Sequence, residues 1–355
     1  MVTSTMNQPR ILVVGGGSIG QRHVKNLLSV GASVGVVEPD PGRIGQLWAL
    51  GKLSYNITGP IHTSVELALG FASHHGDYFS GAIVAVPTHL HAECALPLLK
   101  LGLPVLIEKP LAHTVESAEL LRHYAKQIRV GYTMRFHPAI QAIKEHLPEI
   151  GRVIYAHAEV GQHLPQWHPT EDYREWYMAK KEQGGGAILD LSHELDYLQW
   201  LVAPVRQADA FVDHVDETLQ ISSDDLADIR GWMGDTRFTC HMDLIDRSYN
   251  RRVRILGEKG TLDWDHDRGT VRIMGPGKNR TVEIPTDRNI QFLQEERWFL
   301  NWCAGGDSGD LESFDGAFHT LNVVESLVIS MGMNPVEVGA GAYYDSSRHP
   351  RSRRQ

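Results

Sequence analysis

One group of residues has the types and the spacing needed to hold a phosphorylated small molecule. The loop GGGSIG at residues 15–20 contains the pattern G-x-G-x-x-G, follows the β-rich run Ile11–Val14 and opens a helical pattern. In that context Gly15 permits a tight turn, Gly17 lets backbone approach a pyrophosphate, and Gly20 lets helix and strand pack closely. The N–H groups of the helix N-terminus favour the phosphates, so the loop predicts a dinucleotide site.

An acidic residue directly follows the second β-rich run, Ser33–Val37. Glu38 stands where a carboxylate can bind the adenosine ribose hydroxyls and repel a 2′-phosphate, which favours NAD over NADP. The nearby Arg43 argues the other way. The alternative is an ordinary glycine turn with a surface glutamate, but strand, loop, helix and acid in register argue against it.

A lysine follows a further apolar run. Glu108-Lys109-Pro110 comes directly after Val105–Ile107. Proline disfavours the helical region for the residue before it, so we expect Lys109 to be extended at the carboxyl end of a strand. Open parallel sheets bind ligands at that edge, where a lysine can hydrogen-bond a substrate hydroxyl and favour its deprotonation. Taken alone, the tripeptide favours a surface lysine in a turn over a site residue.

A third group lies on a predicted helix, about Ile188–Val202, that follows the glycines at 184–186. Asp190 and His193 are three residues apart, so both point the same way on one helix. A carboxylate beside an imidazole orients the ring and raises its pKa, which suits a general acid or base. A lone helical histidine is more often structural, but the preceding glycines favour a site.

The elements that must position these residues change character along the chain. Up to about residue 130, apolar runs alternate with helical patterns, which predicts a parallel sheet covered on both faces. After Gly131, longer strand-like segments separated by turn signals predict an antiparallel sheet, with helices near 290–303 and 316–330. We predict domains at 1–130 and 131–340 and a flexible tail at 341–355.

Composition excludes several classes of protein. The 355 residues are 42% hydrophobic and 22% charged, unlike a coiled coil, a collagen-like chain or a disordered chain. A net charge of −9 argues against nucleic-acid binding, and no apolar stretch predicts a membrane helix or signal peptide. Cys94, Cys240 and Cys303 are far apart, which predicts no disulfide framework, no zinc or other metal site, and a reducing, cytoplasmic setting.

Together these pieces resemble the Gfo/Idh/MocA family of NAD(P)-dependent sugar and polyol oxidoreductases over roughly residues 10–335. The stretches that carry the resemblance are RILVVGGGSIGQRHVKNL, AIVAVPTHLHAECALPLLKLGLPVLIEKPLA, GYTMRFHPA, GGGAILDLSHELDYLQWL and ILGEKGTLDW. The resemblance implies an N-terminal Rossmann domain of doubly wound α/β type and a C-terminal α+β domain with a large, mostly antiparallel sheet. It also implies a nicotinamide cofactor and a homodimer or homotetramer.

The resemblance assigns roles to single residues. Lys109 matches the lysine of the family's EKP motif, and His193 matches its catalytic histidine. Asp190 matches an aspartate that in the family precedes that histidine by four residues; here the gap is three, which puts its role in doubt. The residues expected to bind the cofactor are Gly15, Gly17, Ser18, Ile19, Gly20, Glu38, Arg43, Pro87, Thr88, His91, Glu108 and Lys109. Thr88 also has a structural interpretation, as the N-cap of the following helix.

The segment Gln162–Gln183 is dense in aromatic and basic residues. Flat aromatic rings suit sugar faces and basic groups suit a carboxylate or phosphate, although a surface excursion anchored by aromatics is the alternative. The expected substrate-binding residues are Lys109, Arg135, Trp167, His168, Tyr177, Asp190 and His193. With DLSHELDYLQWL, the segment is similar to a subgroup associated with nine-carbon sugar acids and nucleotide-linked sugars.

The leading interpretation is an NAD-dependent dehydrogenase or reductase acting on a CH–OH group of a sugar acid, nucleotide sugar or polyol. Lys109 and His193 would share the proton transfer while the cofactor carries the redox chemistry. Two alternatives stay open. One is a glycosidase that oxidises its sugar transiently and recycles bound NAD, and the other is a non-enzymatic protein that senses NAD or sugar.

Overall fold

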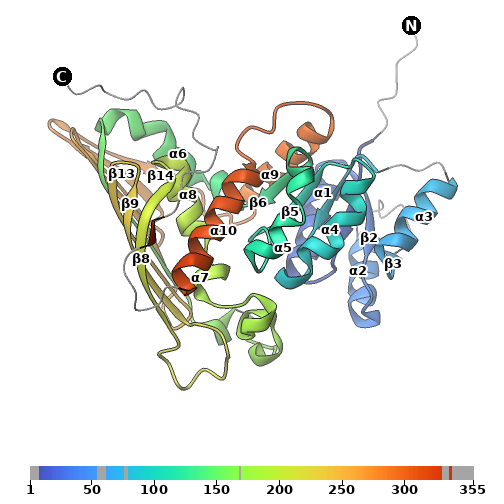
Figure 1. Cartoon of the computed structure of the whole chain (residues 1–355). Coiled ribbons are helices and arrows are strands. Elements are labelled where there is room, and N and C mark those ends of the chain that lie inside the picture. The colour runs from blue at the N-terminus through green and yellow to red at the C-terminus, as the bar shows by residue number, and fades with distance from the viewer. Residues whose placement is uncertain (1–7, 54–60, 76–78, 168, 330–335, 338–355) are drawn as a thin grey trace, which may run out of the picture. The chain divides into compact units, whose positions relative to one another are not determined.

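The computed structural model describes residues 8–53, 61–75, 79–167, 169–329 and 336–337, which fall into two compact units (Figure 1). The first unit comprises the chain up to Gln141 together with Glu175–Gly185 and Pro285–Phe314. The second comprises Ala142–Arg174, Gly186–Ile284 and the chain from Asp315. The sequence-based limits, 1–130 and 131–340, stay a prediction, and the expected tail at 341–355 lies outside the described residues.

The first unit is built on a seven-stranded sheet with the order β15-β6-β5-β4-β1-β2-β3. Its strands are β1 (Arg10–Val14), β2 (Ser33–Val37), β3 (Ile61–His62), β4 (Gly81–Val84), β5 (Val105–Glu108), β6 (Ile128–Gly131) and β15 (Glu312–Ser313). All pairs are parallel except β15 with β6. The predicted doubly wound parallel sheet is confirmed, and the strand order reverses between β1 and β4, where such sheets bind ligands.

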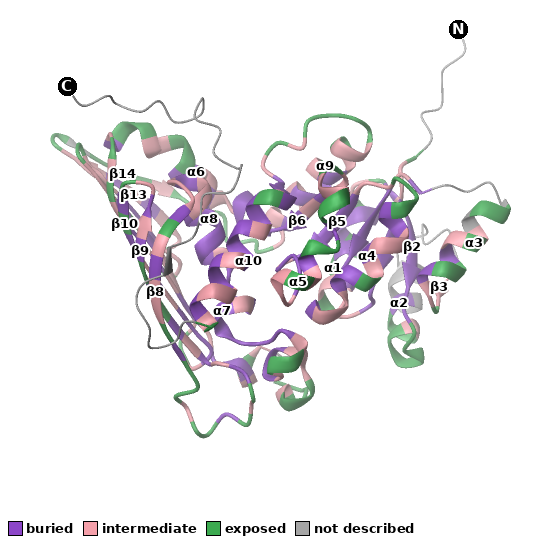
Figure 2. Ribbon diagram, in the orientation of Figure 1, coloured by how far each residue is buried: buried purple, intermediate pink, exposed green. Residues whose placement is uncertain are grey.

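Apolar side chains explain why these strands lie inside the unit. The central strands are buried along nearly their whole length, as continuous apolar runs in a sheet covered on both faces require (Figure 2). The helices of the unit are α1 (Ser18–Ser29), α2 (Pro41–Leu53), α3 (Val65–His75), α4 (His91–Lys100), α5 (Val115–Glu119) and α9 (Ile290–Cys303). Helix α6 (Pro138–His146) spans the limit between the units.

The second unit is built on a nine-stranded sheet with the order β14-β13-β12-β11-β7-β10-β9-β8-β16. Its strands are β7 (Val153–Gly161), β8 (Val205–Asp213), β9 (Leu226–Met233), β10 (Thr236–Asp243), β11 (Asn250–Gly257), β12 (Thr261–Asp265), β13 (Thr270–Gly275), β14 (Lys278–Glu283) and β16 (Val336–Glu337). Every pair is antiparallel except β7 with β10, so the predicted antiparallel sheet is confirmed with one parallel pair.

The helices of the second unit are α7 (Ala187–Asp190), α8 (His193–Leu201) and α10 (Phe314–Ile329). The prediction of one helix over Ile188–Val202 was wrong, because Leu191 and Ser192 separate α7 from α8. The Ser192 hydroxyl donates to the Leu189 carbonyl at 2.8 Å and so competes with continued helical hydrogen bonding. Asp190 and His193 therefore lie on two helices rather than one.

None of the helices within the described residues combines the length and the apolar character needed to cross a membrane.

Candidate functional site

The glycine-rich loop joins β1 to α1, and its glycines have different surroundings. A Cβ at Gly15, whose φ is +107°, would overlap the Ala85 carbonyl, and one at Gly20 would overlap the Gly15 carbonyl. At Gly17 no atom lies within 4 Å of the Cβ position. Gly15 and Gly20 are therefore required by packing inside the protein, whereas Gly17 leaves open space at the first turn of α1. Ser18 and Ile19 form the start of that helix.

Glu38 lies against this loop at the end of β2. Its side chain is almost wholly buried. Oε2 accepts the Gly16 N–H at 2.6 Å and Oε1 accepts the Asp40 N–H at 2.8 Å. Arg43 is more than half exposed, with Nη1 4.0 Å from Glu38 Oε2. The carboxylate thus has fixed backbone partners beside the loop, while the arginine is a distant and solvated neighbour.

The segment that follows β4 contains Pro87, Thr88 and His91. Thr88 begins a 3-10 turn over Thr88–Leu90, and α4 starts from Leu90 without a side-chain cap, so the N-cap interpretation of Thr88 was wrong. His91 is buried, with Nδ1 2.9 Å from the Pro110 carbonyl and Nε2 3.0 Å from the Val86 carbonyl. Burial lowers the pKa of His91. The ring therefore lies between the segments that follow β4 and β5.

Lys109 stands at the carboxyl end of the parallel strand β5, the location that the sequence predicts. Its peptide bond to Pro110 is cis. The Lys109 side chain is half-buried, and its backbone N–H donates to Glu108 Oε2 at 3.2 Å. Glu108 is itself buried beneath the lysine.

The sequence-based reasoning missed three buried neighbours of Glu108: His23 on α1, and Glu295 and Glu296 on α9. Only His23 could have been found from the spacing of residues in the sequence. His23 comes three residues after Gly20 and so shares the buried face of α1. No local pattern could indicate the two glutamates. Glu296 forms its contact with His23 across 273 residues of chain, and Glu295 is its neighbour on the same helix.

The second unit holds the other predicted catalytic residues. Asp190 is buried at the end of α7, and His193 is half-buried at the start of α8. Asp224 caps α7, because its Oδ2 accepts the Ile188 N–H at 2.9 Å. Burial raises the pKa of Asp224 to about 6. Gly186, with a φ of +121°, is needed there because a Cβ would overlap that carboxylate.

The residues expected to contact substrate are divided between the two units. Trp167 belongs to the second unit, where its Nε1 donates to the Gln162 carbonyl at 3.3 Å, whereas Tyr177 belongs to the first. Arg135 is buried and forms an ion pair with Glu312, so its guanidinium already has an anionic partner within the protein. His168 lies outside the described residues.

The first unit fits a bound dinucleotide. Gly17 offers unobstructed backbone at a helix N-terminus, and Glu38 offers a carboxylate next to it. The strands β1, β2 and β5 are parallel members of one sheet, so their carboxyl ends lie at the same end of it. Gly17 follows β1, Glu38 follows β2 and Lys109 follows β5, so all three lie at that end. This edge can therefore hold NAD with a lysine at the same end of the sheet.

Two family models match the chain: the oxidoreductase family with an NAD-binding Rossmann fold over residues 9–136, and the GFO/IDH/MocA C-terminal domain over residues 140–263. The chain thus belongs to the GFO/IDH/MocA family of oxidoreductases. The resemblance found in the sequence is confirmed, as is the expectation of an NAD-binding fold.

Particular relatives are similar to this chain at low identity. Inositol 2-dehydrogenase 1 of Saccharopolyspora erythraea is 25% identical over 93% of this chain and 96% of its own. Levoglucosan dehydrogenase of Pseudarthrobacter phenanthrenivorans is 28% identical over 65% of this chain, and the match spans 60% of that relative's length. A solved structure of levoglucosan dehydrogenase with NADH and levoglucosan has a TM-score of 0.77 and 19% identity, covering 93% of this chain and 99% of that one.

Proposed function

We propose that the protein is an NAD-dependent dehydrogenase or reductase that exchanges hydride with a secondary alcohol or ketone of a sugar or polyol. One observation carries this proposal: Gly17, Glu38 and Lys109 follow parallel strands at one edge of the N-terminal sheet. Relatives named as inositol and levoglucosan dehydrogenases support a polyhydroxylated substrate.

In this proposal NAD supplies the hydride chemistry when it is bound. The first turn of α1 holds the pyrophosphate, and Glu38 accepts hydrogen bonds from the adenosine ribose. Lys109 hydrogen-bonds the reacting hydroxyl and shares the proton transfer with His193, with Asp190 as a further proposed contact. Trp167 and Tyr177 stay proposed substrate contacts, because aromatic rings suit sugar faces.

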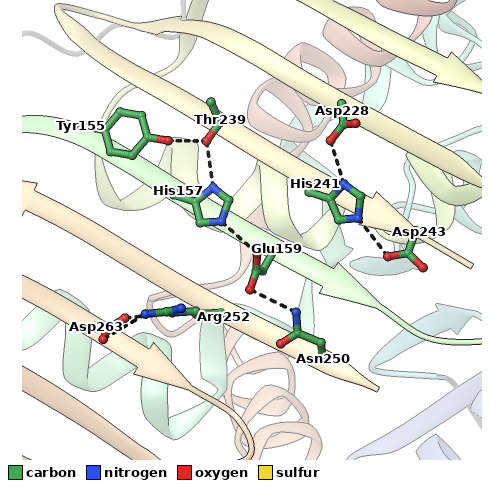
Figure 3. A network of polar contacts seen from close by, with 10 residues as sticks. All are labelled: Tyr155, His157, Glu159, Asp228, Thr239, His241, Asp243, Asn250, Arg252 and Asp263. Carbon is green, nitrogen blue, oxygen red and sulfur yellow. Dashed lines mark hydrogen bonds and ion pairs between the residues drawn. The ribbon is translucent and has the colours of Figure 1, made fainter. Parts of the chain in front are cut away.

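We also infer a homo-oligomer located in the cytoplasm. Helix α8 contacts β7 and β10 on one face of the nine-stranded sheet. The opposite face presents a polar network that includes His157, Glu159 and His241 (Figure 3). A half-buried polar sheet face suits pairing with a second copy of the chain. The three cysteines are free thiols, which suits a reducing compartment.

The test is an absorbance assay for NADH formation with inositols, levoglucosan and sugar acids, with NAD and NADP in parallel. We expect NADH with at least one polyol, and a kcat that falls about 10²- to 10⁴-fold in Lys109→Ala, the range for loss of a positioned proton-transfer group. Lys100→Ala, an exposed lysine at the end of α4, is the matched control. Undiminished turnover by Lys109→Ala contradicts the mechanism, and glycoside cleavage without net NADH indicates the transient-redox alternative.

A further inference from the structure

Four ionisable side chains are buried together beneath the end of β5. They are His23 on α1, Glu108 on β5, and Glu295 and Glu296 on α9, each at least nine-tenths buried. His23 Nε2 lies 2.8 Å from Glu108 Oε1, and His23 Nδ1 lies 2.5 Å from Glu296 Oε1. All four belong to the first unit. The proposed function uses none of them directly except Glu108, as a neighbour of Lys109.

The two contacts of His23 require a proton between each ring nitrogen and its carboxylate. A neutral imidazole supplies only one, so the second proton places a positive charge on the ring or is held by Glu296. Burial alone would lower the pKa of His23, but the charges and hydrogen bonds of Glu296 and Glu108 outweigh it and raise that pKa well above its ordinary value. The carboxyl groups of Glu296 and Glu108 therefore favour the cationic form of the imidazole.

Glu108 links His23 to the backbone of Lys109. Burial would raise its pKa, but the hydrogen bond from His23 and the charges of His23 and Lys109 hold that pKa below its ordinary value. Its Oε1 faces His23, and its Oε2 accepts the backbone N–H of Lys109 at 3.2 Å. The carboxylate thus bridges the imidazole and the lysine backbone.

Glu295 differs from its neighbour Glu296. Both of its carboxylate oxygens are buried and have no hydrogen-bond partner among the described residues. Burial and the charge of Glu108 raise the pKa of Glu295 well above its ordinary value. Because Glu295 forms no hydrogen bond with His23 or Glu108, it is a natural control within the same cluster.

We propose that His23, clamped by Glu296, is a positioning residue for Lys109, and that it acts by fixing the Glu108 carboxylate that holds the lysine backbone. This inference rests on the proposed function of Lys109. His91 contacts the Pro110 carbonyl directly, and His23 contacts the carboxylate that accepts the Lys109 N–H. Two buried histidines therefore support the Lys109–Pro110 segment. Arg22 and Cys303 are further ionisable groups close to the cluster; burial lowers the pKa of Arg22 and raises the pKa of Cys303 to about 12.

The same atoms could form a metal site, since His23, Glu108 and Glu295 each offer a ligand atom, all within 4.8 Å of one another. The contacts of His23 favour a proton instead, because both ring nitrogens lie at hydrogen-bond distance from carboxylates. Dialysis against EDTA separates the two possibilities. We expect unchanged kcat and unchanged unfolding temperature, whereas loss of either together with a bound metal overturns the assignment of a proton.

The decisive comparison is between the same substitution at two adjacent positions of α9. We expect Glu296→Gln to lower kcat about tenfold or more, because a small displacement of a reacting group has a cost of up to ~10²-fold. It should also shift the pH–kcat profile while the dissociation constant of NAD changes little. Glu295→Gln changes an adjacent buried carboxyl group that forms no hydrogen bond with His23 or Glu108, so this variant should retain wild-type kcat and pH profile. Equal effects of the two substitutions overturn the proposal.

A second measurement does not depend on turnover. ¹⁵N NMR of histidine-labelled wild-type protein reports the protonation of each ring, with the His23 signal assigned by its absence in His23→Gln. We expect both nitrogens of His23 to be protonated at pH 8 in the wild type. A neutral ring overturns the proposal. If wild type bound NAD and showed the doubly protonated ring but oxidised no polyol, the proposed function would fail while the charge assignment stood.

Discussion

In the proposed function, Glu38 is the residue that we expect to decide between the two nicotinamide dinucleotides. Its carboxylate is fixed by the Gly16 and Asp40 N–H groups, so it cannot swing away from a 2′-phosphate without losing both hydrogen bonds. We expect Glu38→Gln to weaken NAD binding about tenfold, the order of one charge-assisted hydrogen bond, and to improve NADP relative to NAD.

Titration calorimetry with each cofactor measures this selectivity. Arg43→Ala is the matched control, because Arg43 is mostly exposed and 4.0 Å from the carboxylate. Its NAD affinity should stay within about twofold of wild type, since exposed ion pairs contribute little. Wild-type protein that binds NADP as tightly as NAD would contradict the role of Glu38.

Residues that are joined by local spacing could be predicted from the sequence, and residues joined only by tertiary packing could not. The glycine loop and Glu38 follow neighbouring strands, so pattern and sheet topology together placed them at one edge. Glu295 and Glu296 look like the polar positions of an amphipathic helix until α9 packs on α1. Arg135 was expected to bind an anion, and its partner Glu312 lies on a strand that no pattern indicated.

At the scale of the element, the loop between β1 and α1 should respond differently to the same methyl group at two positions. Gly17→Ala adds a Cβ into open space with a backbone φ of −68° that alanine adopts freely, so the unfolding temperature should not change. NAD affinity should fall about tenfold, ~1.4 kcal/mol, because the methyl group occupies the approach to the pyrophosphate.

Gly20→Ala is the contrasting variant, because its Cβ would overlap the Gly15 carbonyl and force α1 away from β1. We expect a loss of stability of about 1–3 kcal/mol, measured by urea unfolding without cofactor. If Gly17→Ala destabilised the protein as much as Gly20→Ala, the open space at Gly17 would not be the cofactor's path.

The bounds of some helices could be predicted from local sequence, whereas those of others depend on specific side-chain contacts. The helix predicted at about Ile290–Cys303 has those bounds in the structure. The helix predicted over Ile188–Val202 is broken at Ser192, whose hydroxyl takes the Leu189 carbonyl. The first turn of α7 depends on Asp224, which is remote in sequence and accepts the Ile188 N–H. Hydrophobic spacing therefore could not predict either the break at Ser192 or this cap.

At the scale of the whole molecule, stability depends on ion pairs in the sheet of the second unit as well as on the apolar core. His241 lies on β10 between two carboxylates, with Nδ1 2.7 Å from Asp228 Oδ1 and Nε2 3.0 Å from Asp243 Oδ2 (Figure 3). The Asp243 hydrogen bond, against the opposing effect of burial and with help from Asp228, raises the pKa of His241 to about 9.

The folded-state pKa of His241 therefore exceeds its unfolded value of about 6.5, so the folded protein binds the proton more tightly. The resulting stabilisation is fully present below the unfolded pKa and is lost as pH rises through about 9. His241→Asn should lower the urea midpoint at pH 6 but much less at pH 9.5, and Asp228→Asn should show a smaller dependence of the same sign. A deficit in His241→Asn that stays constant across this range would mean that packing, rather than the charge on the ring, holds these strands together.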